Sequence, residues 1–203
     1  MISGVPQGSI LGPLLFIIFF NDIAYSTKGA SIIEYADDTV IYVAGKEIKE
    51  INAKLSNAMA ELSVWFRENE LILNLKKGKT EALLFGTAQR IRKFTEPLCI
   101  AHDDGPINIT STYKYLGVHL DSSLNLNSDF DSKYKKASGR LRLLAKIRSH
   151  LDIESAKAIY RSMVLPVLTY CGILNLKLNR TQENMLSSFH NRAMQIVAKN
   201  QRC

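Results

Sequence analysis

The chain has 203 residues, of which 46% are hydrophobic, enough for one large domain or two small ones with a buried core. Residues 1–132 carry 12 basic and 16 acidic groups, a net charge of −4, whereas residues 133–203 carry 14 basic and 3 acidic groups, a net of +11. This basic C-terminal third favours a polyanionic partner; a soluble basic helical domain is the simpler alternative.

Cysteine usage and the absence of targeting signals indicate the compartment. Cys99, Cys171 and Cys203 are far apart and odd in number, which argues against a disulfide framework and against metal-ligand spacing. The N-terminus lacks the basic region of a signal peptide, and the longest apolar run, Leu14–Phe20, is too short to span a bilayer. We therefore expect an intracellular protein, cytoplasmic or nuclear, without a membrane segment.

The first half of the chain predicts two helices separated by a hairpin. Ser9 is placed to cap a helix that contains Leu14–Phe20, and because this helix is apolar nearly all round we expect it to be central. Two β-branched runs follow at 32–44, with Asp37 and Asp38 between them, which is typical of a hairpin with acids at its tip. An amphipathic helix over 47–69 places Trp65 in the core.

The rest of the chain predicts short strands and then helices. The candidate strands are 71–74, 81–85 and 113–120, with weaker ones at 97–100 and 107–110. A Ser-, Asn- and Asp-rich stretch at 121–127 predicts a domain boundary. The helices expected beyond it are 128–149, 153–174 with a kink or end at Pro166, and 181–199. The fold class predicted from this order is α+β.

The adjacent carboxylates of Asp37 and Asp38 are the most informative chemical feature. Two neighbouring acids repel each other, and a divalent cation removes that penalty while supplying chemistry. An Asp-Asp pair alone is common in turns, so its meaning depends on the residues around it.

Four ordered blocks give the pair its context: Gly4–Phe16, which contains Pro6-Gln7-Gly8; Tyr35–Thr39, the Tyr-Ala-Asp-Asp run; Trp65, Asn69 and Leu71 leading to Lys79-Thr80 and Leu84-Phe85; and Tyr115–Asp121. Further on come Tyr160, Pro166, Tyr170-Cys171 and His190–Ala193. In this order they closely resemble motifs B, C, D and E, and the following segment, of the reverse transcriptases of non-LTR (LINE-type, jockey-like) retrotransposons. The resemblance extends over nearly the whole chain.

The resemblance implies a partial right-hand polymerase palm at 1–124, without fingers and motif A, followed by an all-α, thumb-like basic domain at 125–203. It implies RNA-directed DNA polymerase activity by two-metal nucleotidyl transfer. The partners implied are an RNA template, a DNA primer and deoxynucleoside triphosphates, and the cofactor is Mg²⁺ or Mn²⁺.

The resemblance also assigns roles to residues of this sequence. Asp37 is a direct metal ligand and Asp38 an auxiliary one. Lys79 matches the motif D lysine as a proton donor or phosphate contact; Lys77 takes that role if the register slips, and a solvated basic turn is the alternative.

Binding roles follow from the same resemblance. Pro6, Gln7, Gly8, Tyr35 and Ala36 are expected at the template, nucleotide and primer end, and Tyr115, Leu116 and Gly117 at the primer grip. The residues expected on the nucleic-acid backbone are Lys133, Lys136, Arg140 and Lys146 of helix 128–149. The spacing of charges along that helix predicts one basic face, which carries Lys133, Lys136, Arg140, Arg142, Lys146 and Arg148.

The resemblance places a further metal ligand, the motif A aspartate, N-terminal to Gly4, outside this sequence. We therefore expect an incomplete two-metal site, a missing N-terminal part of the same polyprotein, and little or no polymerase activity from this chain alone. The alternative is a non-enzymatic nucleic-acid-binding remnant that uses the basic C-terminal helices. A viral RNA-dependent RNA polymerase or a group II intron maturase fits the C-terminal third less well.

Overall fold

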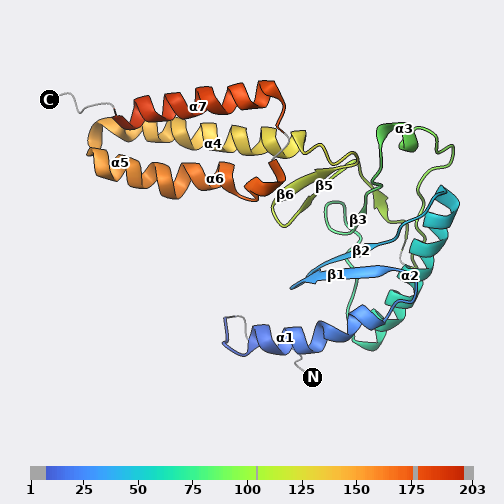
Figure 1. Cartoon of the computed structure of the whole chain (residues 1–203). Coiled ribbons are helices and arrows are strands. Elements are labelled where there is room, and N and C mark those ends of the chain that lie inside the picture. The colour runs from blue at the N-terminus through green and yellow to red at the C-terminus, as the bar shows by residue number, and fades with distance from the viewer. Residues whose placement is uncertain (1–7, 104, 176–177, 199–203) are drawn as a thin grey trace. The chain divides into compact units, whose positions relative to one another are not determined.

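The computed structural model describes residues 8–103, 105–175 and 178–198. The chain forms two compact units, Met1–Leu116 and Gly117–Cys203, drawn in Figure 1. Helices and small two-stranded sheets make up the fold, so the coarse α+β prediction is confirmed. The identities of the two units as palm and thumb stay predictions.

Unit 1 begins with helix α1 (Gly12–Phe20) and a 3₁₀ turn, Asn21–Tyr25. The N-cap position is Leu11, which makes no side-chain cap hydrogen bond, so the predicted cap at Ser9 is displaced. The hydroxyl of Ser9, two residues before that position, accepts a hydrogen bond from the N–H of Gly12 at 3.0 Å. Strands β1 (Ser31–Tyr35) and β2 (Asp38–Tyr42) follow and form an antiparallel pair. The hairpin is thus where the sequence placed it.

Helix α2 (Ile48–Glu68) forms the main core of unit 1. Its spacing of apolar residues buries one face, including Leu62 at 0% exposure, against Ile23, Ile100 and Ile107 from other segments. Trp65 is buried, stacks edge-on against Phe20 with ring centroids 5.3 Å apart, and is a core residue as predicted.

The remaining strands are short, and the last of them, which begins at Val118, belongs to unit 2. Strand β3 (Glu81–Ala82) pairs in parallel with β4 (Asn108–Ile109), and a single helical turn, α3 (Ala88–Ile91), lies between them in sequence. Strand β5 (Thr112–Tyr115) pairs with β6 (Val118–Asp121). The predicted strand 113–120 is therefore two strands, split by a turn at Leu116 and Gly117.

The predicted strand at 71–74 is wrong. Its side chains alternate as in a strand, with Leu71 and Leu73 packed on the core and Ile72 92% exposed. The backbone there is irregular, because within the described residues no second strand pairs with it. The weak strand at 97–100 is also absent from the structure.

Unit 2 is helical after β6. Helix α4 (Asn127–Ile147) lies between α7 (Arg180–Ala198) and the segment formed by α5 (Ile153–Ile159) and α6 (Leu165–Thr169), as Figure 1 shows. Their buried apolar residues form one core: Ala137, Leu141, Leu144, Ala156, Tyr160, Val164, Phe189, Ala193 and Val197. The long helices appear within two residues of their predicted bounds.

The predicted helix over 153–174 is interrupted near Pro166, as its missing N–H requires. A π-helical segment, Tyr160–Val164, lies before α6, which ends at Thr169. A short 3₁₀ segment, Gly172–Asn175, follows.

Helix α1 contradicts the expectation of a central, buried position. Of its residues only Gly12 is buried, while Leu14, Ile17 and Ile18 are 54%, 60% and 65% exposed. Among the described residues, the aromatic contacts that α1 makes outside itself lie at its C-terminal end. There Phe19 and Phe20 approach Trp65 of α2. In the residues that the structure describes, no helix is both long enough and apolar enough to cross a membrane.

Candidate active site

The acidic hairpin has a two-residue tip. Tyr35 pairs with Asp38 at the end of the ladder, which leaves Ala36 and Asp37 as the central residues of the turn. Ala36 is the first central residue of the turn and has a positive φ, +54°. A positive φ at this position allows a two-residue turn to match the twist of the two strands.

Ala36 is strained in this position. A side chain at positive φ costs about 1–2 kcal/mol for an ordinary L-residue, and glycine or asparagine is the usual occupant. An alanine held there is an outlier of the kind that collects at functional sites. Five other described non-glycine residues also have a positive φ, so this strain is a feature of the tip and does not by itself distinguish it.

Both carboxylates at the tip face solvent. Asp37 and Asp38 are exposed, and across the described residues neither accepts a hydrogen bond or forms an ion pair. Their oxygens are hard donors of the kind Mg²⁺ takes, and their mutual repulsion is uncompensated by a described side chain. Among the described residues no cluster of three or more His, Cys, Asp or Glu side chains is arranged to hold a metal ion.

A second pair of acids is Glu34, which lies opposite Thr39 and next to the closing pair of the hairpin, and Asp22 of the 3₁₀ turn before β1. Partial burial and the charge of Asp22 raise the pKa of Glu34 above its ordinary value. Asp22 accepts a hydrogen bond at 3.2 Å from Nε1 of Trp65. Asp22 is thereby tied to the core of unit 1 rather than placed at the tip.

Tyr113 brings the strand of the fourth block close to the hairpin, and sequence reasoning missed it. Burial, with the negative charges of Asp38 and Glu81, raises its pKa. Its hydroxyl donates to the carbonyl of Lys79 at 3.2 Å. The spacing Tyr113-Lys114-Tyr115 puts both tyrosines on one face of β5, the signal that could have revealed it.

The basic turn of the third block is fixed by hydrogen bonds. Lys79 N donates to the carbonyl of Lys76 at 3.0 Å across a turn in which Gly78 has φ +83°. The carboxylate of Glu81 accepts from Gly78 N at 2.9 Å and from Asn108 Nδ2 at 2.8 Å. The hydrogen bond thus joins Tyr113 and the backbone of Lys79 in one neighbourhood, on which the charge of Asp38 acts, and the Lys79 side chain is exposed.

The other residues expected at the template and primer end are exposed where they are described. Gly8 has φ +85° with open space around it, and Tyr35 is 64% exposed. Pro6 and Gln7 lie outside the described residues.

The turn expected to hold the primer has two successive left-handed residues, Leu116 at φ +45° and Gly117 at φ +83°. Two such residues between paired strands form the tight turn that matches strand twist, and a leucine in the first position is strained. A Cβ added to Gly117 would lie 3.2 Å from Cε1 of Tyr170. Tyr115 is half-buried.

Lys133 does not lie on the surface, which corrects its predicted contact with nucleic acid. Its ammonium lies 2.6 Å from Oδ2 of Asp129, a charge contact that lacks hydrogen-bond geometry, and it donates to the carbonyl of Tyr170 at 2.8 Å. Asp129 is completely buried and accepts from the N–H of His119 at 3.0 Å through its other oxygen. A lysine that is 8% exposed and paired with a buried carboxylate is enclosed in the fold and does not present its charge to a phosphate at the surface.

The predicted basic face of α4 is consequently narrower. Arg148, which charge spacing placed on that face, is buried and donates to the carbonyls of Leu151, Ile196 and Val197. Arg148 therefore supplies hydrogen-bond donors to carbonyl groups in the last turn of α7, which lack partners within that helix. Arg140 is half-buried and donates to the carbonyl of Met163 at 2.5 Å. The basic residues of α4 that remain exposed are Lys135, Lys136, Arg142 and Lys146.

Known proteins agree with the pattern of motifs. Residues 2–120 match the family described as "Reverse transcriptase (RNA-dependent DNA polymerase)". The "Probable RNA-directed DNA polymerase from transposon BS" of Drosophila melanogaster is 28% identical, over 97% of this chain and 22% of the relative. The "RNA-directed DNA polymerase from mobile element jockey" of the same fly is 26% identical, over 83% of this chain and 19% of the relative.

A third relative, the "Retrovirus-related Pol polyprotein from type-1 retrotransposable element R1 2" of Nasonia vitripennis, is 26% identical over 83% of this chain and 42% of its own length. The chain therefore spans about a fifth of the two fly polymerases and under half of the wasp polyprotein. No solved structure matches. The predicted resemblance to non-LTR retrotransposon polymerases is confirmed, and the chain belongs to the reverse transcriptase family.

Proposed function

We propose that this chain supplies the catalytic palm hairpin and a thumb to an RNA-directed DNA polymerase of a non-LTR retrotransposon. Its substrates are an RNA template, a DNA primer and deoxynucleoside triphosphates. The observation that carries the proposal is the strained two-residue tip between β1 and β2, which presents Asp37 and Asp38 to solvent beside the Tyr113 and Lys79 neighbourhood.

The donor set at the tip fits a divalent cation. Asp37 would be the direct ligand and Asp38 the auxiliary one, because adjacent exposed carboxylates are stabilised by a shared cation and oxygen donors suit Mg²⁺ or Mn²⁺. When bound, such ions activate the primer 3′ hydroxyl and stabilise charge on the leaving pyrophosphate.

The residues around the tip position the substrates. Tyr35 and Ala36 flank the primer end, and Pro6, Gln7 and Gly8 contact the template and incoming nucleotide. Because glycine has no side chain, the protein backbone at position 8 can approach a ligand closely. These assignments rest on the motif resemblance, and the exposure of Tyr35 and Gly8 supports them.

Three further elements complete the proposed machinery. Lys79, or Lys77 in the shifted register, lies at pyrophosphate, and the fixed turn that precedes Glu81 supports this by holding the Lys79 backbone. Tyr115, Leu116 and Gly117 hold the primer backbone. Lys136 and Lys146, with Arg140 at the edge, contact duplex phosphates from α4.

We propose that these 203 residues alone extend primers little or not at all. Two carboxylates hold a divalent ion more weakly than three, and the motif resemblance puts the third ligand on polypeptide outside this sequence. The greater length of the fly polymerases is compatible with such a missing part.

A graft tests the proposal. This chain replaces the matching segment of the jockey polymerase, and primer extension is measured on poly(rA)–oligo(dT) together with duplex binding. We expect extension that falls at least a hundredfold in the D37N variant, since a direct metal ligand is lost, while D131N, an exposed aspartate of α4, changes it little. Extension that is indifferent to D37N would overturn the proposal.

The remaining outcome favours the second candidate function. The exposed Lys136, Arg142 and Lys146 are suited to duplex binding without catalysis. A graft that binds duplex but does not extend primers, with binding unchanged in the D37A/D38A variant, would favour a non-enzymatic nucleic-acid-binding remnant.

A further inference from the structure

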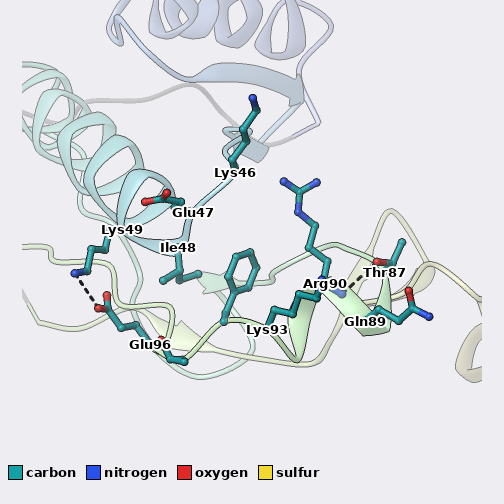
Figure 2. Close-up of a pocket in the computed structure, with 11 residues that line it drawn as sticks. Lys46, Glu47, Ile48, Lys49, Thr87, Gln89, Arg90, Lys93 and Glu96 are labelled. Atoms are coloured by element: carbon teal, nitrogen blue, oxygen red, sulfur yellow. Dashed lines mark hydrogen bonds and ion pairs between the residues drawn. The ribbon is translucent and has the colours of Figure 1, made fainter.

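Unit 1 contains a hollow that is lined by residues outside the acidic hairpin. It has a volume of about 650 Å³ and is formed by the start of α2 and the segment 87–96 (Figure 2). None of its lining residues belongs to the hairpin or to the basic turn of Lys79. The lining is Lys46, Glu47, Ile48, Lys49, Thr87, Gln89, Arg90, Lys93, Phe94, Thr95 and Glu96.

The residues that line the hollow carry a net positive charge, whereas unit 1 as a whole does not. Four cations and two acids line it, a net of +2, whereas residues 1–116 together carry 12 basic and 13 acidic groups, a net of −1. Glu96 is already neutralised by Lys49 at 3.1 Å. Lys46, Arg90 and Lys93 form no ion pair with any residue that the structure describes, and Figure 2 shows the side chains of Lys46 and Arg90 extending toward the same side of the hollow.

The walls of the hollow are fixed to each other. Asn52 of α2 donates to the carbonyl of Pro97 at 3.2 Å and accepts from Cys99 N at 3.0 Å. The hydroxyl of Ser56, one turn further along α2, accepts from Ala101 N at 3.3 Å. The segment that follows the hollow therefore runs along α2, and the cations of both walls are held near one another before any ligand arrives.

The chemistry of the lining suits a nucleotide. Arginine grips a phosphate with two parallel N–H donors, and lysine adds a point charge. Phe94 is half-buried and Ile48 is buried at 6% exposure, so an apolar surface lies beside the cations. An aromatic ring next to cations is the arrangement on which unpaired bases stack.

We propose that this hollow binds single-stranded nucleic acid, with a phosphate between Lys46, Arg90 and Lys93 and a base against Phe94. A single strand fits because its bases are free to leave the stack and enter a cavity, whereas a duplex offers only its backbone. The inference does not rest on the proposed catalytic function, because the site uses none of its residues.

The chain contains a matched control for the test. Arg92 is exposed and lies two residues from Arg90, but it does not line the hollow. R90E and R92E therefore change the net charge equally and differ in whether the hollow is altered. Binding of a fluorescent U12 RNA to the full chain is measured by anisotropy at several salt concentrations.

We expect R90E to weaken binding about tenfold and to lower the salt slope by about 0.7, the value for one lost phosphate contact on a single strand. R92E should stay within about twofold of the wild type, since only the general field changes. F94A should weaken binding about fivefold or more with no change in salt slope, because it removes stacking alone.

Photocrosslinking separates this site from the basic face of α4. RNA with 4-thiouridine should crosslink to the segment 87–96 in the wild type and in D37N/D38N, and lose that crosslink in R90E. Equal weakening by R90E and R92E, or crosslinks confined to Asn127–Ile147, would overturn the proposal, as would an F94A variant that binds like the wild type. A matching DNA dodecamer distinguishes RNA from DNA as the source of the strand.

Discussion

Helices α1 and α4 differ in what their sequences specify. Helix α1 is apolar on every side and is almost wholly exposed, whereas α4 alternates apolar and charged residues and buries Leu141 and Leu144 at 3% and 1% exposure. An amphipathic pattern defines the face that packs, because its other face must remain in water. A helix that is apolar all round indicates only that burial would be favourable, and it does not identify a partner.

The same comparison extends to charge. The tip between β1 and β2 exposes two like charges without a described partner, while α4 encloses an opposite pair, Asp129 and Lys133. Exposed like charges are available to a ligand, and an enclosed opposite pair serves the fold. The charge pair of unit 1 is therefore exposed, whereas that of unit 2 is part of its packing.

The largest expected effect is on the buried pair. K133M leaves the carboxylate of Asp129 buried without its cation and should lower the free energy of unfolding of α4 by about 3–5 kcal/mol. Native-state hydrogen exchange of the full chain measures this over Asn127–Ile147. K136M, on the exposed face of the same helix, should change it by less than about 0.5 kcal/mol.

The double variant D129L/K133M sharpens this result. Replacing both partners with apolar residues removes the uncompensated charge, so it should be less destabilising than K133M alone. A double variant as unstable as K133M would mean that packing volume, and not charge, determines the loss.

A matched pair of truncations compares α4 with α1 directly. L144A should destabilise unit 2 by about 2–5 kcal/mol, because it leaves a cavity in the core. I17A should change the stability of unit 1 by less than about 0.5 kcal/mol, because the Ile17 side chain is 60% exposed. Urea unfolding with hydrogen exchange assigned to each unit checks both, and similar losses would contradict the difference in burial.

Two glycines with the same backbone angle separate strain from crowding. Gly78 and Gly117 both have φ +83°, but only Gly117 faces a neighbour, Tyr170, at 3.2 Å from its added Cβ. G78A should cost about 1 kcal/mol from the backbone alone, and G117A about 1–2 kcal/mol or more. Local exchange around each turn measures the costs; equal values would show that the ring of Tyr170 moves freely aside.

The smallest effect concerns the loop between β6 and α4. Burial raises the pKa of Asp121, but hydrogen bonds from Ser123, Asn125 and Leu126 outweigh it and lower the pKa below its ordinary value of 3.8. The carboxylate form therefore stabilises the fold above pH 3.8, and this stabilisation is lost as the pH falls through the lower folded-state value.

The D121N variant removes that titration. Its urea midpoint should fall less steeply than that of the wild type when the pH is lowered below 3.8. All other carboxylates are shared by the two proteins, so the difference between the two pH profiles isolates Asp121. Parallel profiles would indicate that its hydrogen bonds do not depend on charge.

Periodicity predicted the elements that bury one face, and it failed where burial depends on contacts distant in sequence. Helices α2 and α4 and the hairpin appeared close to their expected bounds because their patterns are local. The side chains of segment 71–74 alternate as in a strand, but no described strand pairs with it. Strand formation depends on such a pairing partner, which local propensity does not supply.

The candidate site divides in the same way. Asp37 and Asp38 were predictable as a turn between strands, but the approach of Tyr113 depends on how β5 lies in the fold. Lys133 and Arg148 matched a basic face by spacing, yet Asp129 and the end of α7 draw both inward. Charge spacing along one helix does not show which cations the neighbouring segments enclose.

Paramagnetic broadening tests whether the tip of the hairpin binds a divalent metal ion. Mn²⁺ is titrated into the ¹⁵N-labelled full chain, and D37N/D38N and D131N are compared with the wild type. We expect broadening of the amides of Ala36–Thr39 at about millimolar Mn²⁺, lost in D37N/D38N and kept in D131N. Broadening that is absent from the tip, or unchanged in D37N/D38N, would contradict this expectation.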